Sequence, residues 1–489
     1  MRRVAQPPRR LWMRRARQWD TGRFPALPGD RVSSPVPSRF DVVVIGGCAS
    51  GTLVAAHLVD GDAPPSVALV EAAPAVGEGV AYATRRGEHL LNVRAAGMSA
   101  FDESPGDFVR FLRTLPEHAG EDPAVLGQRF MPRRVYARYL AAVLDAAPAR
   151  DRVQRVAATA VDVAPVADGF EVELASGARL QARAVVLAVG NRAARLPLDP
   201  AAAAAVAPVD AWDYPAVAAI APDADVCILG AGLSMVDVVL TLRANGHRGR
   251  VVSLSRRGLV PLAHAAPAPA AAIDIEGLLA MDLGARTRAV RALAASEVAA
   301  GRPWQGALDA LRPHGQALWT SLDARAQARF LRHLVRHWDV HRHRIAPEVA
   351  AQLDAAMASS QLQRLAGHLV SIEPGVRSAI AWRPRGGDAV RRFEADVVVN
   401  ALGMDKRIDG GSGLPARLCA RGLLRPGPHR MGAATVGEGV PLDAGGVPVP
   451  GLWTLGTLRI GDLWETIAMP ELRGQARRVA GAVRAHLGP

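Results

Sequence analysis

The sequence has few of the residues that build disulfide frameworks, metal sites or membrane spans. Three cysteines occur in 489 residues, Cys48, Cys227 and Cys419, and they are too few and too far apart for a disulfide framework or a metal knuckle. No segment approaches the ~20 apolar residues of a transmembrane helix. No apolar segment follows the paired arginines near the start, as a secretion signal would require. We therefore expect a protein of the reducing cytoplasm.

The basic charge is concentrated at one end of the sequence. The formal net charge is +13, but residues 1–39 hold ten arginines against Asp20 and Asp30. We predict that residues 1–38, rich in Arg and Pro, form a disordered extension. The rest of the chain has only a modest excess of positive charge and no nucleic-acid recognition element, so we expect no nucleic-acid partner.

A glycine-rich turn follows the first apolar segment. Residues 42–45 are Val-Val-Val-Ile, which suits a strand buried on both faces of a parallel sheet. Gly46 and Gly51 occupy the outer positions of a G-x-G-x-x-G pattern, and apolar residues then recur at helical spacing. A strand, a glycine turn and a helix form the first half of a dinucleotide-binding unit. Cys48 replaces the middle glycine, which normally lets the backbone approach the phosphates.

A second strand and an acidic residue support this interpretation. Residues 66–70 form an apolar segment that ends at Glu71, where a carboxylate is placed to hydrogen-bond an adenosine ribose. An ordinary solvated strand end is the alternative. A further buried strand over residues 184–189 ends at Gly190.

The same pattern occurs again farther along the chain. Residues 225–229 form an apolar segment followed by Gly230 and Gly232, with Met235 at the third glycine position. The next predicted strand, residues 251–254, leads into the pair Arg256 and Arg257. Two such units in one chain indicate two dinucleotides, usually a tightly held flavin and a nicotinamide.

We therefore predict an α/β protein with two nested Rossmann-type dinucleotide-binding domains and a helical insertion. We also expect strands at residues 153–163 and 169–175 and a domain connection over residues 196–224. The expected domains are an FAD-binding domain over residues 39–195 plus 440–489, an NAD(P)-binding domain over residues 196–269 plus 366–439, and a helical insertion over residues 270–365.

The motifs together resemble those of one protein family. The segments that carry the resemblance include GGCASGTLVAAHL, GEGVAYATRRGEHLLNVRAAGMS, CILGAGLSMVDVVLTL, SLSRRGLVPLAH and GLWTLGTLRIGDLWETIAMPELRGQA. They are similar to the bacterial FAD/NAD(P)-binding proteins grouped with FAD-dependent urate hydroxylases and aspartate N-monooxygenases. The resemblance covers roughly residues 40–485, and the family is itself similar to the larger flavin-dependent monooxygenases that use NADPH.

The resemblance implies two cofactor sites, one for FAD and one for NADP(H). The residues implied to bind FAD are Gly46, Gly47, Cys48, Ser50, Gly51, Glu71, Leu91, Asn92, Met98, Gly190, Gly456, Trp464 and Thr466. The residues implied to bind the nicotinamide dinucleotide are Gly230, Gly232, Ser234, Arg256 and Arg257. The two arginines are placed to pair with a 2′-phosphate, which favours NADPH over NADH.

The activity that follows from the resemblance is an FAD- and NADPH-dependent monooxygenase. It would use molecular oxygen, through a flavin C4a-hydroperoxide, to hydroxylate a small polar substrate at nitrogen or on a heterocycle. Such chemistry requires no protein nucleophile, and the candidate catalytic residues are Asn92, His264 and Glu465. His264 could orient nicotinamide or substrate, or make a structural hydrogen bond. An NAD(P)H-dependent flavin oxidoreductase and a degenerate non-catalytic flavoprotein, the latter suggested by Cys48, stay open as alternatives.

A histidine cluster invites a metal-site interpretation. His333, His337 and His341 are spaced four residues apart, so neighbouring members share one helix face. Arg332 and Arg336 lie among them, and their charges oppose a cation. We expect no metal here, but a basic surface that is either structural or faces an anionic substrate.

Overall fold

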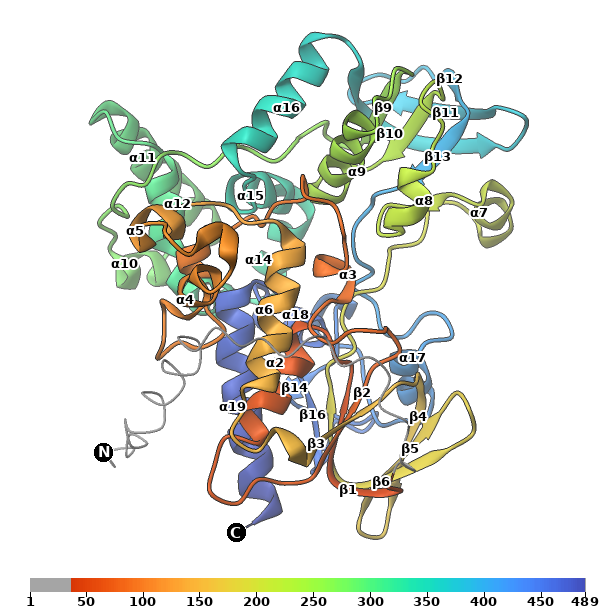
Figure 1. The fold of residues 1–489 in the computed structure, drawn as a ribbon. Coiled ribbons are helices and arrows are strands. Elements are labelled where there is room, and N and C mark those ends of the chain that lie inside the picture. Colours follow the sequence, from red (N-terminus) through yellow and green to blue (C-terminus); the bar gives the residue numbers. More distant parts are fainter. Residues whose placement is uncertain (1–36, 489) are drawn as a thin grey trace. The chain divides into compact units, whose positions relative to one another are not determined.

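The computed structural model describes residues 37–488, so the extension predicted for residues 1–38 lies almost entirely outside it. The chain forms two compact units (Figure 1). The first contains residues up to Ala83, Val93–Gly190 and the chain from Arg407 onwards, and the second contains Thr84–Asn92 and Asn191–Lys406. Residues 407–439 thus lie in the first unit, although we expected them in the NAD(P)-binding domain.

The first unit has a parallel five-stranded core within a seven-stranded sheet. In spatial order, the parallel strands are β3 (Val153–Val156), β2 (Val67–Val70), β1 (Arg39–Ile45), β6 (Arg179–Leu187) and β16 (Leu452–Thr454). An antiparallel hairpin of β4 (Ala160–Val166) and β5 (Gly169–Leu174) pairs with the first half of β6. The single strand predicted at residues 153–163 is wrong, because β3 pairs with β2 whereas β4 pairs with β5.

A fully buried helix follows the first glycine turn. Every residue of α2 (Ala49–Leu58) is buried. The helix lies against α6 (Arg133–Asp145) and α19 (Met469–Leu487), which run beside it in Figure 1. Because α2 is covered all round, it shows no polar face and carries mostly small or apolar residues. Its N-terminus is thereby fixed at the carboxyl end of β1.

The second unit repeats the parallel core. Its parallel strands, in spatial order, are β10 (Leu362–Glu373), β9 (Val251–Ser255), β8 (Val226–Leu229), β13 (Val397–Asn400) and β7 (Val209–Asp210). The antiparallel strands β11 (Ser378–Pro384) and β12 (Arg391–Ala395) extend the sheet from β10. The fold prediction of two Rossmann-type domains is confirmed.

Two segments of the second unit differ from our expectation. Residues 196–224 are more than a connection, since they contain α7 (Pro200–Val206), the edge strand β7 and α8 (Tyr214–Ala218). The helical region ends at residue 358, because Leu362 begins β10. The short β7 and the strand start at Leu362 depend on pairing with distant strands, which local sequence does not reveal.

The helical region has an apolar core of its own, built around Leu278, Leu308 and Leu311. Its helices are α10 (Ile275–Ala280), α11 (Leu283–Ala299), α12 (Gln305–Leu311), α13 (Gly315–Thr320), α14 (Ala324–Arg329), the π-helical turn η5 (Phe330–Leu334), α15 (Val335–Arg342) and α16 (Pro347–Ala358). Among residues 37–488, every helix is too short or too polar to cross a lipid bilayer.

The two glycines of the second turn provide a matched test of this fold. Gly230 has a φ of +125°, and a Cβ there would overlap the Ala401 carbonyl oxygen at the end of β13. A Cβ at Gly232 would meet nothing within 4 Å, and its φ of −92° suits any residue. We expect Gly230→Ala to lower the free energy of unfolding by about 2 kcal/mol or more, and Gly232→Ala by less than about 1 kcal/mol. Denaturant unfolding followed by circular dichroism measures both; equal losses would contradict the assignment.

Candidate functional site

The first glycine turn packs so closely at the end of β6 that a side chain would not fit at Gly46 or Gly51. A Cβ at Gly46, whose φ is +103°, would overlap the Ala188 carbonyl oxygen, and a Cβ at Gly51 would overlap the Gly46 carbonyl oxygen. The Gly47 carbonyl accepts hydrogen bonds from Thr52 Oγ1 at 2.8 Å and from the Gly77 amide at 2.7 Å. The turn is therefore rigid, and its amides precede the N-terminus of α2, a position that suits a pyrophosphate.

Glu71 lies directly beside this turn. Its Oε2 accepts a hydrogen bond from the Gly47 amide at 2.7 Å, and Oε1 accepts one from the Ala73 amide at 2.9 Å. A carboxylate offers about four acceptor positions, so both oxygens retain capacity for ribose hydroxyls. The structure thus joins Glu71 and the glycine turn, which lie far apart in the sequence.

Cys48 occupies space that a glycine outside the motif, Gly79, leaves open. It is the N-cap residue of α2 in an extended conformation, and its Sγ lies 3.7 Å from both Ser50 Oγ and the Ala188 carbonyl oxygen. A Cβ added at Gly79 would lie 2.6 Å from Cys48 Cβ, and one at Gly190 would lie 3.6 Å from Sγ. A Cβ at Gly79 would therefore clash with Cys48, whereas one at Gly190 would meet Sγ at an ordinary van der Waals distance, so the glycine at position 79 is the one that makes room for Cys48.

The Cys48 side chain is a thiol rather than a thiolate. Burial raises its pKa above the ordinary value, the Ser50 hydrogen bond lowers it, and the Glu71 charge raises it further. The net effect is a raised pKa, so the thiol stays protonated at neutral pH and is a poor nucleophile. This agrees with chemistry that needs no cysteine nucleophile.

The segment after β16 contains a strained turn. Trp464 has φ 65° and ψ −74°, and the Glu465 amide donates to the Leu463 carbonyl at 2.8 Å. This is a γ-turn of the rare strained form. Next to it, the Thr466 side chain is fully buried, and its Oγ1 has no hydrogen-bond partner in the described part of the chain. A buried hydroxyl of this kind fits a site that a polar group of a cofactor completes.

Gln475 positions this segment and was not among the residues predicted for the site. Its Oε1 accepts from the Gly456 amide at 3.1 Å, and its Nε2 donates to the Thr466 carbonyl at 3.0 Å. The residue is fully buried on α19. The signal in the sequence was a single amide within the apolar face of that helix, between Leu472 and Val479.

Met98 belongs to the first unit and lies in a fixed loop. Its side chain is buried. The following Ala100 amide donates to the Tyr139 hydroxyl at 2.9 Å, which donates to Asp107 Oδ2 at 2.7 Å. Arg473 on α19 also donates to the Ser99 carbonyl at 3.1 Å. The loop is thus held from two helices.

Leu91 and Asn92 belong to the second unit. His264 Nε2 lies 2.9 Å from the Asn92 carbonyl oxygen, so the imidazole donates to this carbonyl. His89, which sequence reasoning missed, is fully buried; its Nδ1 lies 2.8 Å from Thr84 Oγ1 and its Nε2 lies 2.9 Å from Thr241 Oγ1. These histidines hold residues 84–92 against the rest of the second unit.

The second glycine turn is arranged like the first. The Gly230 amide donates to the Leu254 carbonyl at 2.9 Å, and helix α9 (Leu233–Ala244) begins directly after Gly232. Ser234 Oγ accepts from Trp212 Nε1 at 3.2 Å. The open space at Gly232 and the positive end of α9 suit a pyrophosphate.

Arg256 and Arg257 follow β9, the second strand of this unit. Arg257 Nη1 lies 3.2 Å from His337 Nε2, which places the histidine cluster beside the arginine pair. His341 Nδ1 lies 2.7 Å from the His337 carbonyl oxygen. Among residues 37–488, no three His, Cys, Asp or Glu side chains are grouped to hold a metal ion.

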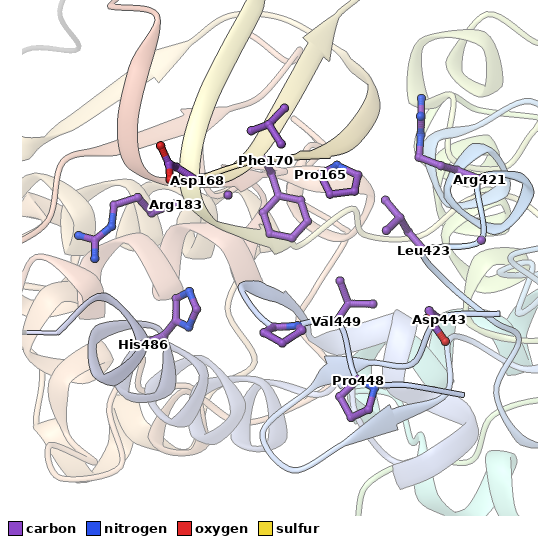
Figure 2. Close-up of a pocket in the computed structure, with 14 residues that line it drawn as sticks. Pro165, Asp168, Phe170, Arg183, Arg421, Leu423, Asp443, Pro448, Val449 and His486 are labelled. Atoms are coloured by element: carbon purple, nitrogen blue, oxygen red, sulfur yellow. The ribbon is translucent and has the colours of Figure 1, made fainter. Parts of the chain in front are cut away.

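A cavity of about 520 Å³ lies elsewhere in the first unit (Figure 2). Its wall combines Phe170 and prolines with Arg183, Arg421 and His486. The cavity adjoins the start of β5 and residues 448–450, which precede β16. It is thus at the amino-terminal side of β16, whereas dinucleotides bind at the carboxyl ends of parallel strands. It includes none of the predicted site residues.

The pair Cys48 and Gly79 permits a double-mutant test of this packing. Gly79→Ala places a Cβ against Cys48 Cβ at a φ of +58°, so we expect a loss of about 3 kcal/mol in unfolding free energy. Combined with Cys48→Gly, the same substitution should lose only the backbone term of about 1–2 kcal/mol. Thermal and denaturant unfolding of the four proteins measures this; strictly additive losses would contradict the contact.

A comparison with known protein families matches the part of the chain that contains the first glycine turn. Residues 43–192 match the protein-family model described as FAD-NAD(P)-binding. The chain matches no curated protein sequence.

Solved structures of similar fold include three amino-acid hydroxylases or monooxygenases. An ornithine N-hydroxylase from Kutzneria sp. 744 is 14% identical with a TM-score of 0.62, covering 91% of this chain and 99% of its own. The ornithine hydroxylase from Pseudomonas aeruginosa is 14% identical with a TM-score of 0.64, covering 92% and 100%. The L-lysine 6-monooxygenase from Pseudomonas syringae is 15% identical with a TM-score of 0.63, also covering 92% and 100%. At these identities, the likeness establishes a shared fold with two Rossmann-type domains.

Proposed function

We propose that this protein is an FAD- and NADPH-dependent monooxygenase that hydroxylates a small polar substrate, at nitrogen or on a heterocycle. The observation that carries the proposal is the presence of two complete dinucleotide-binding cores in one chain. The first has a rigid glycine turn beside Glu71. The second has an open turn at Gly232, and two arginines follow its next strand.

The first unit supplies a fitting set of groups for FAD. The amides after Gly46 and the start of α2 would bind the pyrophosphate, and the remaining acceptor positions of Glu71 would bind ribose hydroxyls. The unpaired hydroxyl of Thr466 supplies a hydrogen bond that the described chain does not use. FAD, when bound and reduced by NADPH, supplies the oxygen-activating chemistry.

The second unit supplies the corresponding groups for NADPH. Gly230, Gly232 and Ser234 would surround the pyrophosphate at the N-terminus of α9. Arg256 and Arg257 lie where a guanidinium can pair with a 2′-phosphate. NADPH, the hydride donor, would therefore be recognised by the charges of the two arginines as well as by the glycine turn.

The remaining candidate residues would position the substrate and exclude water. The Asn92 carbonyl accepts a hydrogen bond from His264, which holds the Asn92 backbone in place, and the side-chain amide of Asn92 is the group proposed to hydrogen-bond flavin or substrate. His264 therefore acts as a positioning residue. Glu465 follows the strained turn at Trp464 and is buried, so the turn would set the direction of its carboxylate.

The similar structures support this class of reaction. The Kutzneria enzyme is described as an ornithine N-hydroxylase with reduced FAD, NADP⁺ and L-ornithine, and the Pseudomonas syringae enzyme as an L-lysine 6-monooxygenase. Both names describe hydroxylation of small amine-bearing substrates. Amino acids are therefore the first substrates to examine, followed by purines.

The coupling of NADPH oxidation to substrate hydroxylation tests the proposal. The FAD-loaded protein should oxidise NADPH, and with its substrate it should form hydroxylated product while releasing less hydrogen peroxide. We expect Asn92→Ala to lower product per NADPH by about tenfold in the FAD-loaded protein, because the backbone bond to His264 is retained while the side-chain amide is lost. Product is measured by mass spectrometry and peroxide by a peroxidase assay.

Two outcomes would contradict the proposal. Peroxide release that matches NADPH consumption with every amino acid and purine would indicate a flavin oxidoreductase. Absence of NADPH oxidation by the FAD-loaded protein would indicate a flavoprotein without this catalytic activity.

A further inference from the structure

The helical region contributes side chains to the arginine pair after β9. Arg257 Nη1 lies 3.2 Å from His337 Nε2 on α15, and Arg257 Nη2 lies 3.4 Å from the Arg332 carbonyl oxygen in η5. Arg332 lies in a π-helical turn, a feature that occurs often at functional sites, and His337 lies in the helix that follows it. Elements that are about 75 residues apart in the sequence therefore form one cluster.

The hydrogen bond fixes the protonation state of His337. A guanidinium nitrogen can only donate, so His337 Nε2 accepts and its proton resides on Nδ1. The imidazole is therefore neutral in this arrangement. A proton added at Nε2 would convert this acceptor into a donor and would end the hydrogen bond with Arg257.

The surroundings of the cluster are strongly cationic. Burial lowers the pKa of His337, and the charges of Arg257, His341, Arg385 and Arg291 lower it further. Burial likewise lowers the pKa of Arg256, followed by the charges of Arg336 and Arg257. The nearby carboxylate is Asp339, which pairs with Arg336 at 3.0 Å, and the Lys406 ammonium faces both of these groups.

We propose that His337 is a third ligand of the NADPH 2′-phosphate, and that phosphate binding drives a proton from solvent onto its Nε2. The inference rests on the proposed NADPH dependence of the second unit. The added proton lets Nε2 donate to a phosphate oxygen and frees Arg257 Nη1 to donate to another. Arg257 and His337, which form a donor–acceptor pair in the free protein, would then both donate to the anion.

The sign of the pH dependence follows from this exchange. In the free protein the pKa of His337 lies below its ordinary value, and a dianionic phosphate beside it raises the pKa. Between the His337 pKa of the free protein and the higher pKa of the bound protein, NADP⁺ binding therefore takes up a proton. Affinity for NADP⁺ relative to NAD⁺ falls as the pH rises through the pKa of the bound protein. A purely structural His337 would show no such dependence.

Isothermal titration calorimetry of the full chain tests the inference. NADP⁺ and NAD⁺ are titrated near neutral pH in phosphate-free buffers that differ in ionisation enthalpy, which gives the number of protons taken up per ligand bound. We expect uptake approaching one proton with NADP⁺ and none with NAD⁺. His337→Gln should abolish most of the uptake and weaken NADP⁺ binding about threefold to tenfold near pH 6.5, with little effect near pH 8.5.

His333→Gln serves as the matched control, because His333 is also exposed and lies four residues earlier in the same segment. The 2′-phosphate of NADP⁺ can itself exchange protons on binding, and this contribution cancels when the NADP⁺ titrations of wild type and variant are compared. Unchanged melting temperature and FAD affinity in both variants show that the fold is intact.

Three other outcomes would contradict the role proposed for His337. Equal proton uptake in wild type and His337→Gln, with NADP⁺ still preferred over NAD⁺, would refute the role of His337 and leave the proposed function standing. Failure of the wild type to bind NADP⁺ would refute both. The same His337-dependent uptake with an acidic amino acid, but no preference for NADP⁺, would assign the cluster to substrate instead.

Discussion

Close contact between a glycine and the end of a neighbouring parallel strand is the constraint on which both units depend. A Cβ at Gly46 would overlap the Ala188 carbonyl oxygen after β6, and a Cβ at Gly230 would overlap the Ala401 carbonyl oxygen after β13. Because the backbone approaches so closely, each turn is narrow and its helix begins at the strand end. The positions of the two helix N-termini, on α2 and α9, follow directly from this contact, and each is a position that suits an anion.

The middle position of each turn shows how much variation this constraint permits. Gly232 has open space around it, whereas Cys48 fills a volume that Gly79 leaves empty. The first motif therefore departs from the usual pattern without loss of the turn, because a glycine outside the motif makes room for the cysteine. Judged by residue identity alone, the first motif lacks its middle glycine, although the backbone geometry of the turn is intact.

Sequence was sufficient for the features that depend on local pattern. The strands beside Gly46 and Gly230, the helices after them and the position of Glu71 all follow from apolar runs and glycine spacing. The sequence was not sufficient where structure depends on pairing with distant strands. It does not separate β3 from β4 or show that β7 is a strand, and it does not predict the antiparallel strands β11 and β12. Gln475 and His89 were missed because their importance lies in partners far along the chain.

One chain is proposed to bind FAD in its first unit and to receive electrons from NADPH bound by its second. Anaerobic titration of the purified protein tests this, with FAD added first and NADPH second, while the flavin absorption band is recorded. We expect one FAD per chain and loss of that band on addition of NADPH, more slowly with NADH. A protein that binds no FAD, or a bound flavin that neither nicotinamide reduces, would contradict this proposal.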